Sequence, residues 1–355
     1  MNLRQMQYLC EIAKRELNIS AVAAALHTNQ PGISKQVKLL ETELGIEIFV
    51  RSRNRLSGIT PHGRKIIEMA QGITNEVANM KAVSRDVVQK DSGSLVIAVT
   101  HTQARYVLPE VIKRFTARYP KVSITMRHAD PEKITEMLLS GAADLGVTTN
   151  DPPALRELAV LPVREFKRVV VVPRGHKLLR SRRLTLKELA RHPIVTYEPA
   201  FTAREIVVRA FDKAKLEPKL VISSIDADVI KTCVEQGMGI AVLSEVTFDA
   251  GRDLNLAAIP AGHLFDPSIT KIWLCRKHYL RRYAYDFIEM CNPRWSRSAV
   301  EHLMAERPTT PGVTSPRQNL HAMRKSLKNS KDPQTRQKPH RRGGAVPATY
   351  ANPID

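Results

Sequence analysis

The sequence predicts an α/β effector module of two Rossmann-like lobes, preceded by a helical N-terminal domain and one long helix. Between residues 91 and 300, short apolar runs that suit buried strands alternate with helix-patterned segments, as in a parallel sheet covered by helices. Residues 1–59 carry closely spaced helix patterns instead, and residues 60–90 carry a heptad-like apolar repeat. At 355 residues with 43% hydrophobic content, the chain is long enough for two or three domains with ordinary cores.

The charge and cysteine content limit the function classes. A formal net charge of +20 predicts a polyanionic partner, with nucleic acid as the first candidate and an acidic membrane surface as the second. The four cysteines form no C-x-x-C pair, which argues against a zinc site or a disulfide framework and favours a reducing, cytoplasmic compartment. No segment approaches the roughly 18 apolar residues of a membrane span, and the N-terminus lacks an export signal, so neither membrane insertion nor export is expected.

Residues 28–44 predict a bounded amphipathic helix. Thr28 or Asn29 can cap its N-terminus, Pro31 suits its first turn, and Gly45 ends it. One buried stripe is expected, made of Ile33, Val37, Leu40 and Leu44. The other faces carry polar side chains that match base edges and phosphates in a major groove, namely Gln30, Ser34, Lys35 and Lys38.

Two shorter helices precede this segment. An apolar face predicts the first over residues 3–15, and Ser20 is expected to cap a short Ala-rich second helix at residues 21–26. Helix, short helix, turn and a third helix with a polar face is the helix-turn-helix arrangement. A three-helix packing unit without a DNA role is the alternative, but the basic charge balance favours DNA binding.

A wing is expected after the third helix. Residues 46–50 favour a short strand, and the turn that follows carries three arginines that can reach phosphates or a narrow minor groove. A solvated loop is the alternative for these arginines. We therefore expect an all-α winged helix-turn-helix domain over residues 1–59. Its expected DNA contacts are Ser20, Thr28, Asn29, Gln30, Pro31, Ser34, Lys35, Lys38, Arg51, Arg53 and Arg55.

A long linker helix is predicted over residues 60–90, beginning at Thr60-Pro61. Its apolar residues follow the heptad-like spacing of a helix that pairs with another helix, and they are Ile66, Ala70, Ile73, Val77 and Met80. Dimerisation is the simplest use, and packing on the chain's own next domain is the alternative. A dimer would place two recognition helices on successive turns of DNA.

Residues 91–300 are expected to form two lobes, the first from about 91–162 and 266–300, the second from about 163–265. In open α/β sheets a ligand sits outside the carboxyl ends of the strands, where helix N-termini favour an anion. Hydroxyl groups occupy such strand or helix ends at Thr100, Thr102, Thr149 and Thr202. Their shared position predicts a pocket for a small anion without a fixed cationic side chain, although each threonine alone could simply cap a helix.

Catalysis is not expected. The chain has no Walker-type phosphate loop, no H-E-x-x-H and no G-x-S-x-G sequence. His101 lies beside Thr102, but no nucleophile or carboxylate partner is evident by spacing, so we interpret it as structural. The chain is therefore predicted not to be an enzyme and to use no metal or cofactor.

The order of these segments resembles the LysR-type transcriptional regulators over about residues 1–300, and the run QPGISKQ at residues 30–36 is similar to their recognition helix. Three further strings resemble the CysB branch of that family, which governs sulfur assimilation. They are THTQARY at residues 100–106, DADVIKT at residues 226–232 and YDFI at residues 285–288.

The resemblance implies a periplasmic-binding-protein-like effector module in a homotetrameric activator of sulfur-acquisition genes, acting on double-stranded promoter DNA together with RNA polymerase. It implies an effector pocket built from the residues matching Thr100, Thr102, Gln103, Thr149 and Thr202. The implied effector is a small anion such as sulfate, an acetylserine-type metabolite or a sulfonucleotide. The alternative is a cytoplasmic solute-binding or sensing protein whose N-terminal helices contact another protein instead of DNA.

Residues 301–355 lie beyond the resemblance and are basic and rich in Pro, Ser, Thr and Gln, the composition of a disordered tail. Two interpretations of this tail remain: it makes an auxiliary nonspecific DNA contact, or it is an inert extension.

Overall fold

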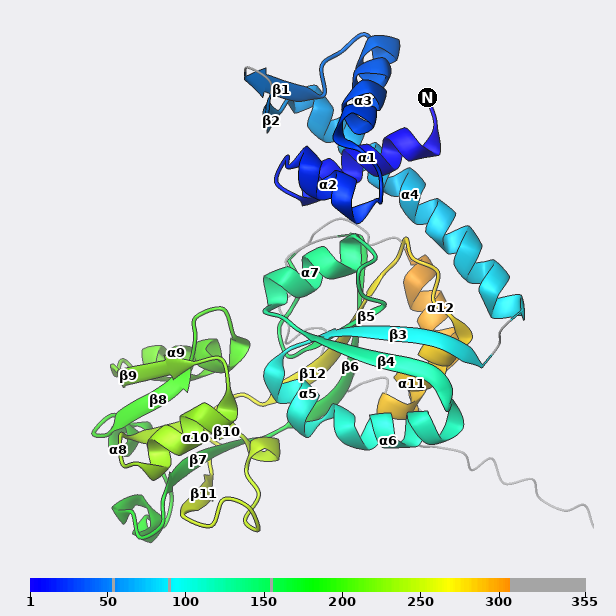
Figure 1. The fold of residues 1–355 in the computed structure, drawn as a ribbon. Helices are drawn as coiled ribbons and strands as arrows, with labels where there is room; N and C mark the ends of the chain where they lie inside the picture. The colour runs from blue at the N-terminus through cyan, green and yellow to red at the C-terminus, as the bar shows by residue number, and fades with distance from the viewer. Residues whose placement is uncertain (53–54, 89–90, 154–155, 307–355) are drawn as a thin grey trace, which may run out of the picture. The chain divides into compact units, whose positions relative to one another are not determined.

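The computed structural model of the chain describes residues 1–52, 55–88, 91–153 and 156–306 (Figure 1). Arg53 of the expected wing and the tail from residue 307 lie outside the described residues. The described chain forms a three-helix domain with a two-stranded sheet, a long helix and two α/β lobes, which confirms the predicted fold class. None of the described helices is long and apolar enough to cross a membrane.

The N-terminal domain packs α1 (Leu3–Lys14), α2 (Ile19–Ala25) and α3 (Gln30–Leu44) around one apolar core. Asn29 caps α3, because its Oδ1 accepts a hydrogen bond from the Gly32 amide at 2.7 Å, and Gly45 ends the helix with a φ of 67°. Ile33, Val37 and Leu40 are buried as predicted, but Leu44 is 36% exposed. The prediction for Leu44 is wrong because the helix ends there and Glu41 occupies the last buried position.

The expected cap of α2 is also wrong. Asn18 caps this helix, since its Oδ1 accepts from the Ala21 amide at 3.0 Å, and the helix begins at Ile19. Ser20 lies within α2, is exposed, and donates a hydrogen bond to Oε1 of Gln30 at 3.1 Å. Both Asn and Ser suit a cap position, so residue type alone does not select between them.

The wing is a hairpin of β1 (Phe49–Ser52) and β2 (Arg55–Ile59), so the N-terminal domain is not all-α. The strand expected at residues 46–50 starts too early. The amides of Ile48 and Phe49 donate instead to Oε1 of Glu41 at 2.9 and 3.1 Å. A side chain distant in sequence therefore determines where the wing begins.

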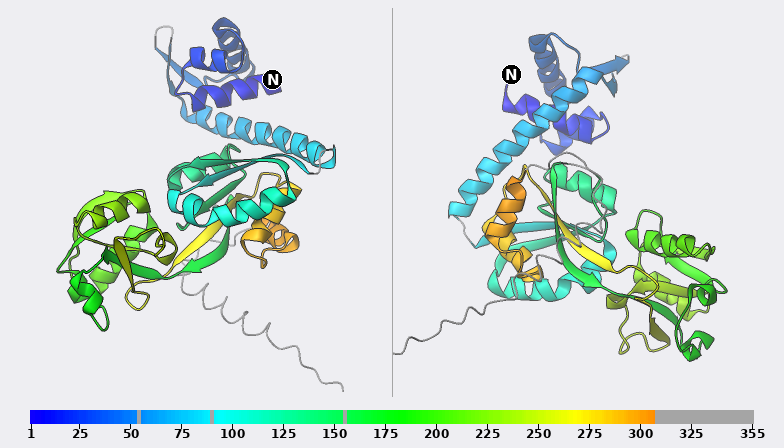
Figure 2. Two further views of the ribbon diagram at one scale, coloured as in Figure 1. Left: turned by 60° about the horizontal axis from the view of Figure 1, so that its bottom comes forward. Right: turned by 180° about the vertical axis from the view of Figure 1, so that it is seen from behind.

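Helix α4 (Pro61–Val88) follows as one continuous helix (Figure 2). Thr60 caps it by accepting from the Gly63 amide at 2.9 Å. Ile66 and Ala70 pack on the N-terminal core, whereas Met80 is 71% exposed. The apolar stripe is thus used partly within the chain, and Ile73 and Met80 of its remainder are exposed.

A different face of α4 contacts the first lobe. Asn79 donates to the carbonyl of Lys277 and accepts from the amide of Tyr279, both at 2.8 Å. Further along the helix, Asp86 accepts from the hydroxyl of Tyr279 at 2.9 Å. The two side chains therefore fix α4 to the loop that follows the last strand of this lobe.

The first lobe, lobe I, contains a five-stranded sheet in the order β4-β3-β5-β12-β6. Its strands are β3 (Ser92–Val99), β4 (Lys121–His128), β5 (Leu145–Thr148), β6 (Leu158–Phe166) and β12 (Ser268–Cys275). Its helices are α5 (His101–Tyr106), α6 (Leu108–Arg118), α7 (Pro131–Leu139), α11 (Arg282–Cys291) and α12 (Arg297–Ala305). Because α12 runs to Ala305, ordered structure extends past residue 300.

The second lobe, lobe II, contains a sheet in the order β11-β7-β10-β8-β9. Its strands are β7 (Arg168–Pro173), β8 (Pro193–Tyr197), β9 (Lys219–Ser224), β10 (Ile240–Ser244) and β11 (Leu256–Pro260). Its helices are α8 (Leu186–Leu189), α9 (Thr202–Lys213) and α10 (Ala227–Glu235), with 3-10 turns η1 (Lys177–Arg180) and η2 (Glu245–Thr247).

The expectation of parallel sheets is wrong in part. In lobe I, β12 runs antiparallel to both β5 and β6, and in lobe II, β7 runs antiparallel to β10 and β11. These strands lie next to the two places where the chain passes between the lobes. The crossing at Lys167 joins β6 directly to β7, and this places the first residue of β7, Arg168, between the lobes.

Two glycines of α4 provide a matched test of the junction between this helix and the N-terminal domain. A Cβ at Gly63 would overlap the carbonyl oxygen of Ile48, whereas a Cβ at Gly72 would meet no described atom outside its own stretch of helix within 4 Å. We expect Gly63→Ala to lower the free energy of unfolding of the N-terminal domain by about 1–3 kcal/mol through overpacking. Gly72→Ala should raise it by about 0.5–1 kcal/mol, because alanine is the better helix former. Chemical denaturation of both variants checks this, and equal effects at the two glycines would contradict it.

Candidate functional site

The exposed face of α3 begins with a side chain that α2 holds in place. The bond from Ser20 to Oε1 of Gln30 fixes the amide and leaves its NH2 group free to donate. Gln30, Lys35 and Lys38 are exposed and Ser34 is half-buried, while Thr28 and Pro31 flank the helix start. The N-terminal half of α3 thus presents amide, hydroxyl and ammonium groups suited to base edges and phosphates.

The wing is fixed to α3 by an ion pair. The Arg51 guanidinium lies 2.7 Å from the Glu41 carboxylate, which is 8% exposed and also accepts the two amides at the start of the wing. Arg51 therefore has a structural role in addition to its predicted DNA role. Arg55 is exposed on β2. The contacts of Glu41 therefore join the start of the wing to α3.

A pocket lies where the two lobes meet the β6–β7 crossing. Four of the five expected effector residues line it, and they are Thr100, Thr102, Gln103 and Thr149. Thr202 is the first residue of α9 and does not line the pocket, although its neighbours Phe201 and Ala203 do. Tyr197 and Ser244 of lobe II complete the wall opposite α5.

The polar groups of the lobe I wall are oriented by the protein. Thr100 is the N-cap residue of α5, but its hydroxyl makes no capping bond. Gln103 is 4% exposed, and its Oε1 accepts from the Thr270 hydroxyl at 2.7 Å, so its NH2 group is the end left to donate. The hydroxyl of Thr102 lies 3.4 Å from that of Tyr197 in lobe II. Donor groups from α5 are therefore held ready at the pocket.

Arg168 introduces a buried cation that the sequence analysis did not identify. It is 1% exposed, and among the described residues nothing accepts a hydrogen bond from its Nε or Nη2. Burial lowers the pKa of Arg168 to about 10, which leaves the guanidinium charged at neutral pH. Ser244, its register partner on β10, is also buried, and its Oγ has no hydrogen-bond partner either. The expectation of a pocket without a fixed cationic side chain is therefore wrong.

An isolated buried charge costs several kcal/mol of effective desolvation. A guanidinium has only donors, arranged in a planar fork that matches two oxygens of a carboxylate, phosphate or sulfate. The charge could have been noticed in the sequence, because Arg168 stands directly before the valine run of residues 169–172. A run of four valines favours a buried strand, and an arginine at the start of such a strand shares its burial.

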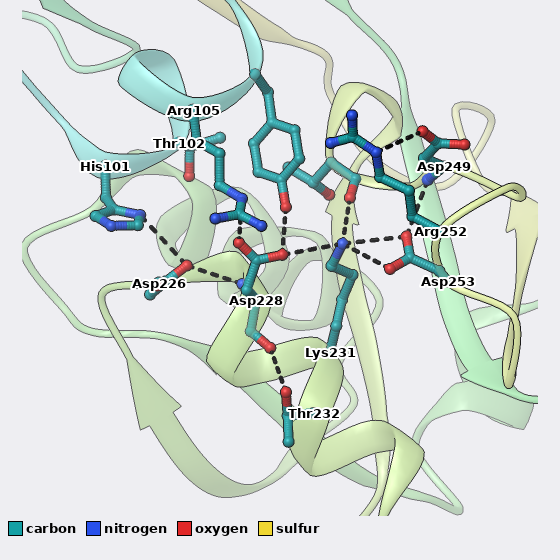
Figure 3. Close-up of polar contacts among 12 residues, drawn as sticks. His101, Thr102, Arg105, Asp226, Asp228, Lys231, Thr232, Asp249, Arg252 and Asp253 are labelled. Carbon is teal, nitrogen blue, oxygen red and sulfur yellow. Dashed lines mark hydrogen bonds and ion pairs between the residues drawn. The ribbon is translucent and has the colours of Figure 1, made fainter.

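The opposite face of α5 is held to the start of α10 (Figure 3). Nε of Arg105 lies 2.5 Å from Oδ2 of Asp228, and the hydroxyl of Tyr106 donates to Oδ1 of the same carboxylate at 2.5 Å. Lys231 lies 3.1 Å from Asp228 and 2.9 Å from Asp253. We call Arg105, Tyr106, Asp228, Lys231 and Asp253 the inter-lobe clamp.

His101 also connects α5 to the start of α10. Its Nδ1 lies 3.3 Å from Oδ1 of Asp226, the residue that caps α10. His101 therefore lines the pocket beside Thr102 and Gln103 and also contacts α10. The two sequence strings at 100–106 and 226–232, which carry the family resemblance, meet here (Figure 3).

Comparison with protein-family models assigns both parts of the chain. Residues 3–64 match the bacterial regulatory helix-turn-helix protein model of the lysR family, and residues 89–296 match the LysR substrate binding domain, which alone spans more than half of the chain. The chain belongs to the LysR family of transcriptional regulators. Family membership confirms a DNA-binding regulator with an effector-binding domain for small molecules. It excludes the enzyme class and the alternative in which the N-terminal helices contact another protein instead of DNA.

Several LysR-family relatives match nearly end to end. The HTH-type transcriptional regulator SsuR of Burkholderia cenocepacia is 41% identical over 86% of this chain and 99% of its own. The HTH-type transcriptional regulator CysB of Haemophilus influenzae is 42% identical over 85% of this chain and 93% of its own. The crystal structure of the cofactor-binding domain of the Cbl transcriptional regulator covers 61% of this chain and 95% of its own, with a TM-score of 0.58 and 35% identity.

The clamp of this LysR-family protein is open to a direct test. Burial opposes ionisation of Asp228, but hydrogen bonds from Tyr106 and Lys231 and the nearby cations hold its pKa below the usual range. Its stabilising effect is therefore present above the ordinary aspartate pKa and is lost as the pH falls through the lowered value.

We expect Asp228→Asn to lower the free energy of unfolding by about 1–2 kcal/mol at pH 7, since a partly exposed carboxylate loses its charged partners. The difference from wild type should narrow as the pH falls towards 3. Asp266→Asn is the matched control, because Asp266 pairs with Arg209 at 3.3 Å on the exposed surface of lobe II. Equal losses in both variants in urea denaturation would show that the clamp has no special role.

Proposed function

We propose that the chain is a cytoplasmic activator of sulfur-acquisition genes, which include those of cysteine biosynthesis and of sulfate or sulfonate assimilation. We further propose that a small sulfur-related oxyanion in the inter-lobe pocket controls it. The observation that carries the anion proposal is the buried guanidinium of Arg168 beside the Ser244 hydroxyl, because Nε and Nη2 of Arg168 and Oγ of Ser244 have no hydrogen-bond partner among the described residues. The CysB-like strings and the similarity to CysB and SsuR support the sulfur assignment.

The chemistry of the pocket favours an oxyanion over a cation or an apolar ligand. Among the described residues that line it, none carries a carboxylate. Arg168 donates only, Gln103 has its NH2 group left to donate, and hydroxyls come from Thr100, Thr102 and Thr149. Sulfate is the smallest ligand with the matching chemistry, and acetylserine-type and sulfonucleotide ligands present the same oxyanion on a larger body.

An effector acts by favouring one arrangement of the protein over another. An anion on Arg168 also contacts α5, and α5 is joined to lobe II through the inter-lobe clamp. Occupancy of the pocket can therefore stabilise one relative position of the lobes. We propose that a change in the relative position of the lobes reaches the DNA-binding surface through lobe I and its contacts with α4.

The exposed apolar residues of α4 support self-association into a dimer and then a homotetramer. Met80 and Val87 are 71% and 69% exposed, and they extend the stripe beyond the part that packs on the N-terminal core. Pairing of two such helices would bury these side chains and place two α3 helices on one DNA site. RNA polymerase is the proposed downstream partner of the assembled activator.

A mobility-shift titration tests this function with the full-length chain. We expect wild type to bind a sulfur-acquisition promoter duplex more tightly than a shuffled duplex, and sulfate to change the shift. Gln30→Ala should lose about 1–3 kcal/mol of discrimination, because a base-edge contact is removed. Thr102→Ala should leave basal DNA affinity unchanged but weaken sulfate binding about fivefold, the loss of one neutral hydrogen bond.

Thr202→Ala is the matched comparison, since Thr202 lies beside the pocket lining without belonging to it. Its effect on sulfate affinity, measured by calorimetry, should be smaller than that of Thr102→Ala. Equal affinity for promoter and shuffled duplexes would overturn the sulfur-gene proposal. An absence of heat with sulfate, acetylserine and adenosine phosphosulfate alike would overturn the pocket proposal.

A further inference from the structure

One segment of lobe II carries a concentration of positive charge that neither α3 nor the pocket uses. Residues 174–191, which include η1 and α8, hold seven Lys or Arg and a single carboxylate, Glu188. The rest of lobe II, residues 167–173 and 192–266, holds nine Lys or Arg against eleven Asp or Glu. The whole positive surplus of lobe II therefore comes from this one stretch, here called the basic segment.

We propose that the basic segment is a second DNA-contacting surface, which binds backbone phosphates without reading sequence. It acts in addition to α3 and the wing and depends on neither the effector nor the identity of the target genes. The N-terminal domain, residues 1–60, has only eight Lys or Arg against five Asp or Glu. The basic segment thus carries a larger net positive charge than the whole N-terminal domain.

The cations of the basic segment are available to a ligand. All seven are exposed, and they are Arg174, Lys177, Arg180, Arg182, Arg183, Lys187 and Arg191. Across the described chain, none of them lies within 4.0 Å of a carboxylate oxygen, whereas other cations of lobe II are paired, such as Lys231 with Asp253. The carboxylate of Glu188 is occupied by the hydroxyls of Ser181 and Thr185.

The basic segment is anchored, so its cations are presented on a fixed surface. Leu178, Leu184 and Leu189 are 5%, 2% and 0% exposed and belong to the core of lobe II. His176 and His192 bring the two ends of the segment together, with ring centroids 4.9 Å apart. Burial lowers the pKa of both histidines, so the charge at neutral pH comes from the seven lysines and arginines.

DNA is the partner that fits these groups. Guanidinium and ammonium groups only donate, and a duplex presents a dense row of phosphates whose neutralisation releases counterions. As a member of the LysR family, this chain already binds DNA through its N-terminal domain. An acidic protein would offer carboxylates of the same sign, and the experiment below separates it from DNA.

The test is the salt dependence of DNA binding by the full-length chain. The patch variant carries Arg180→Gln, Arg182→Gln, Arg183→Gln and Lys187→Gln. Each lost phosphate contact reduces the slope of log Kobs against log salt by about 0.9, so we expect the slope to fall by about 1 to 3.6 for each DNA-bound protomer. The change should be the same on promoter and shuffled duplexes, because phosphate contacts carry no sequence information.

A matched control removes the same charge elsewhere. Lys113, Lys121, Arg127 and Lys219 are exposed, and their change to Gln should leave the slope at the wild-type value. A second variant with Arg180→Lys, Arg182→Lys and Arg183→Lys keeps the charge and should keep the slope.

A patch variant whose slope equals that of the control overturns the proposal, and this is the result expected if the basic segment binds an acidic protein instead. The readout needs no sulfur-gene promoter and no effector. Failure of the proposed function would therefore appear separately, as a loss of promoter preference or of effector response.

Discussion

A buried positive charge that has no partner within the described part of the chain is the constraint that organises the two lobes. Arg168 is the first residue of β7, directly after the chain has crossed from one lobe to the other. Its guanidinium faces hydroxyl and amide donors but no carboxylate among the described lining residues. Such an arrangement is costly in the unliganded protein and becomes favourable when an anion supplies the missing acceptors. The pocket is therefore destabilising by itself, and its polar groups are complementary to an anion.

The surrounding structure keeps this costly site intact. Residues 101–103 of α5 line the pocket, and the helix is held to α10 through Asp226 and the inter-lobe clamp. Lobe I in turn is fixed to α4 by Asn79 and Asp86, and α4 begins in the core that also positions α3. A continuous set of packed and hydrogen-bonded elements thus connects the pocket to α3.

Features set by neighbouring residues could be predicted from the sequence. The bounds of α3 follow from Asn29 and Gly45, and its polar face follows from helical spacing. The cap of α2 was misassigned because Asn18 and Ser20 are both good caps. Features set by distant residues could not be predicted. Glu41 determines where the wing begins, and strand pairing determines that β12 and β7 run antiparallel to their neighbours.

The same distinction applies to the site. The threonines at strand and helix ends were visible as a pattern, and so was the excess of charge along the chain. The role of Arg168 depends on Ser244 and Tyr197, which reach it only through the sheet of lobe II. Exposure of the cations in residues 174–191 likewise depends on three leucines that pack into the core of that lobe.

The most direct measurement is calorimetric titration of sulfate into wild type and Arg168→Met, together with the melting temperature of each without ligand. Removing an uncompensated charge should leave the unliganded melting temperature unchanged or higher, and it should weaken sulfate binding by about 10- to 100-fold, the worth of a charged hydrogen bond. Sulfate affinity in Arg168→Met equal to that of wild type would contradict the assignment of Arg168 as the counter-charge of the effector.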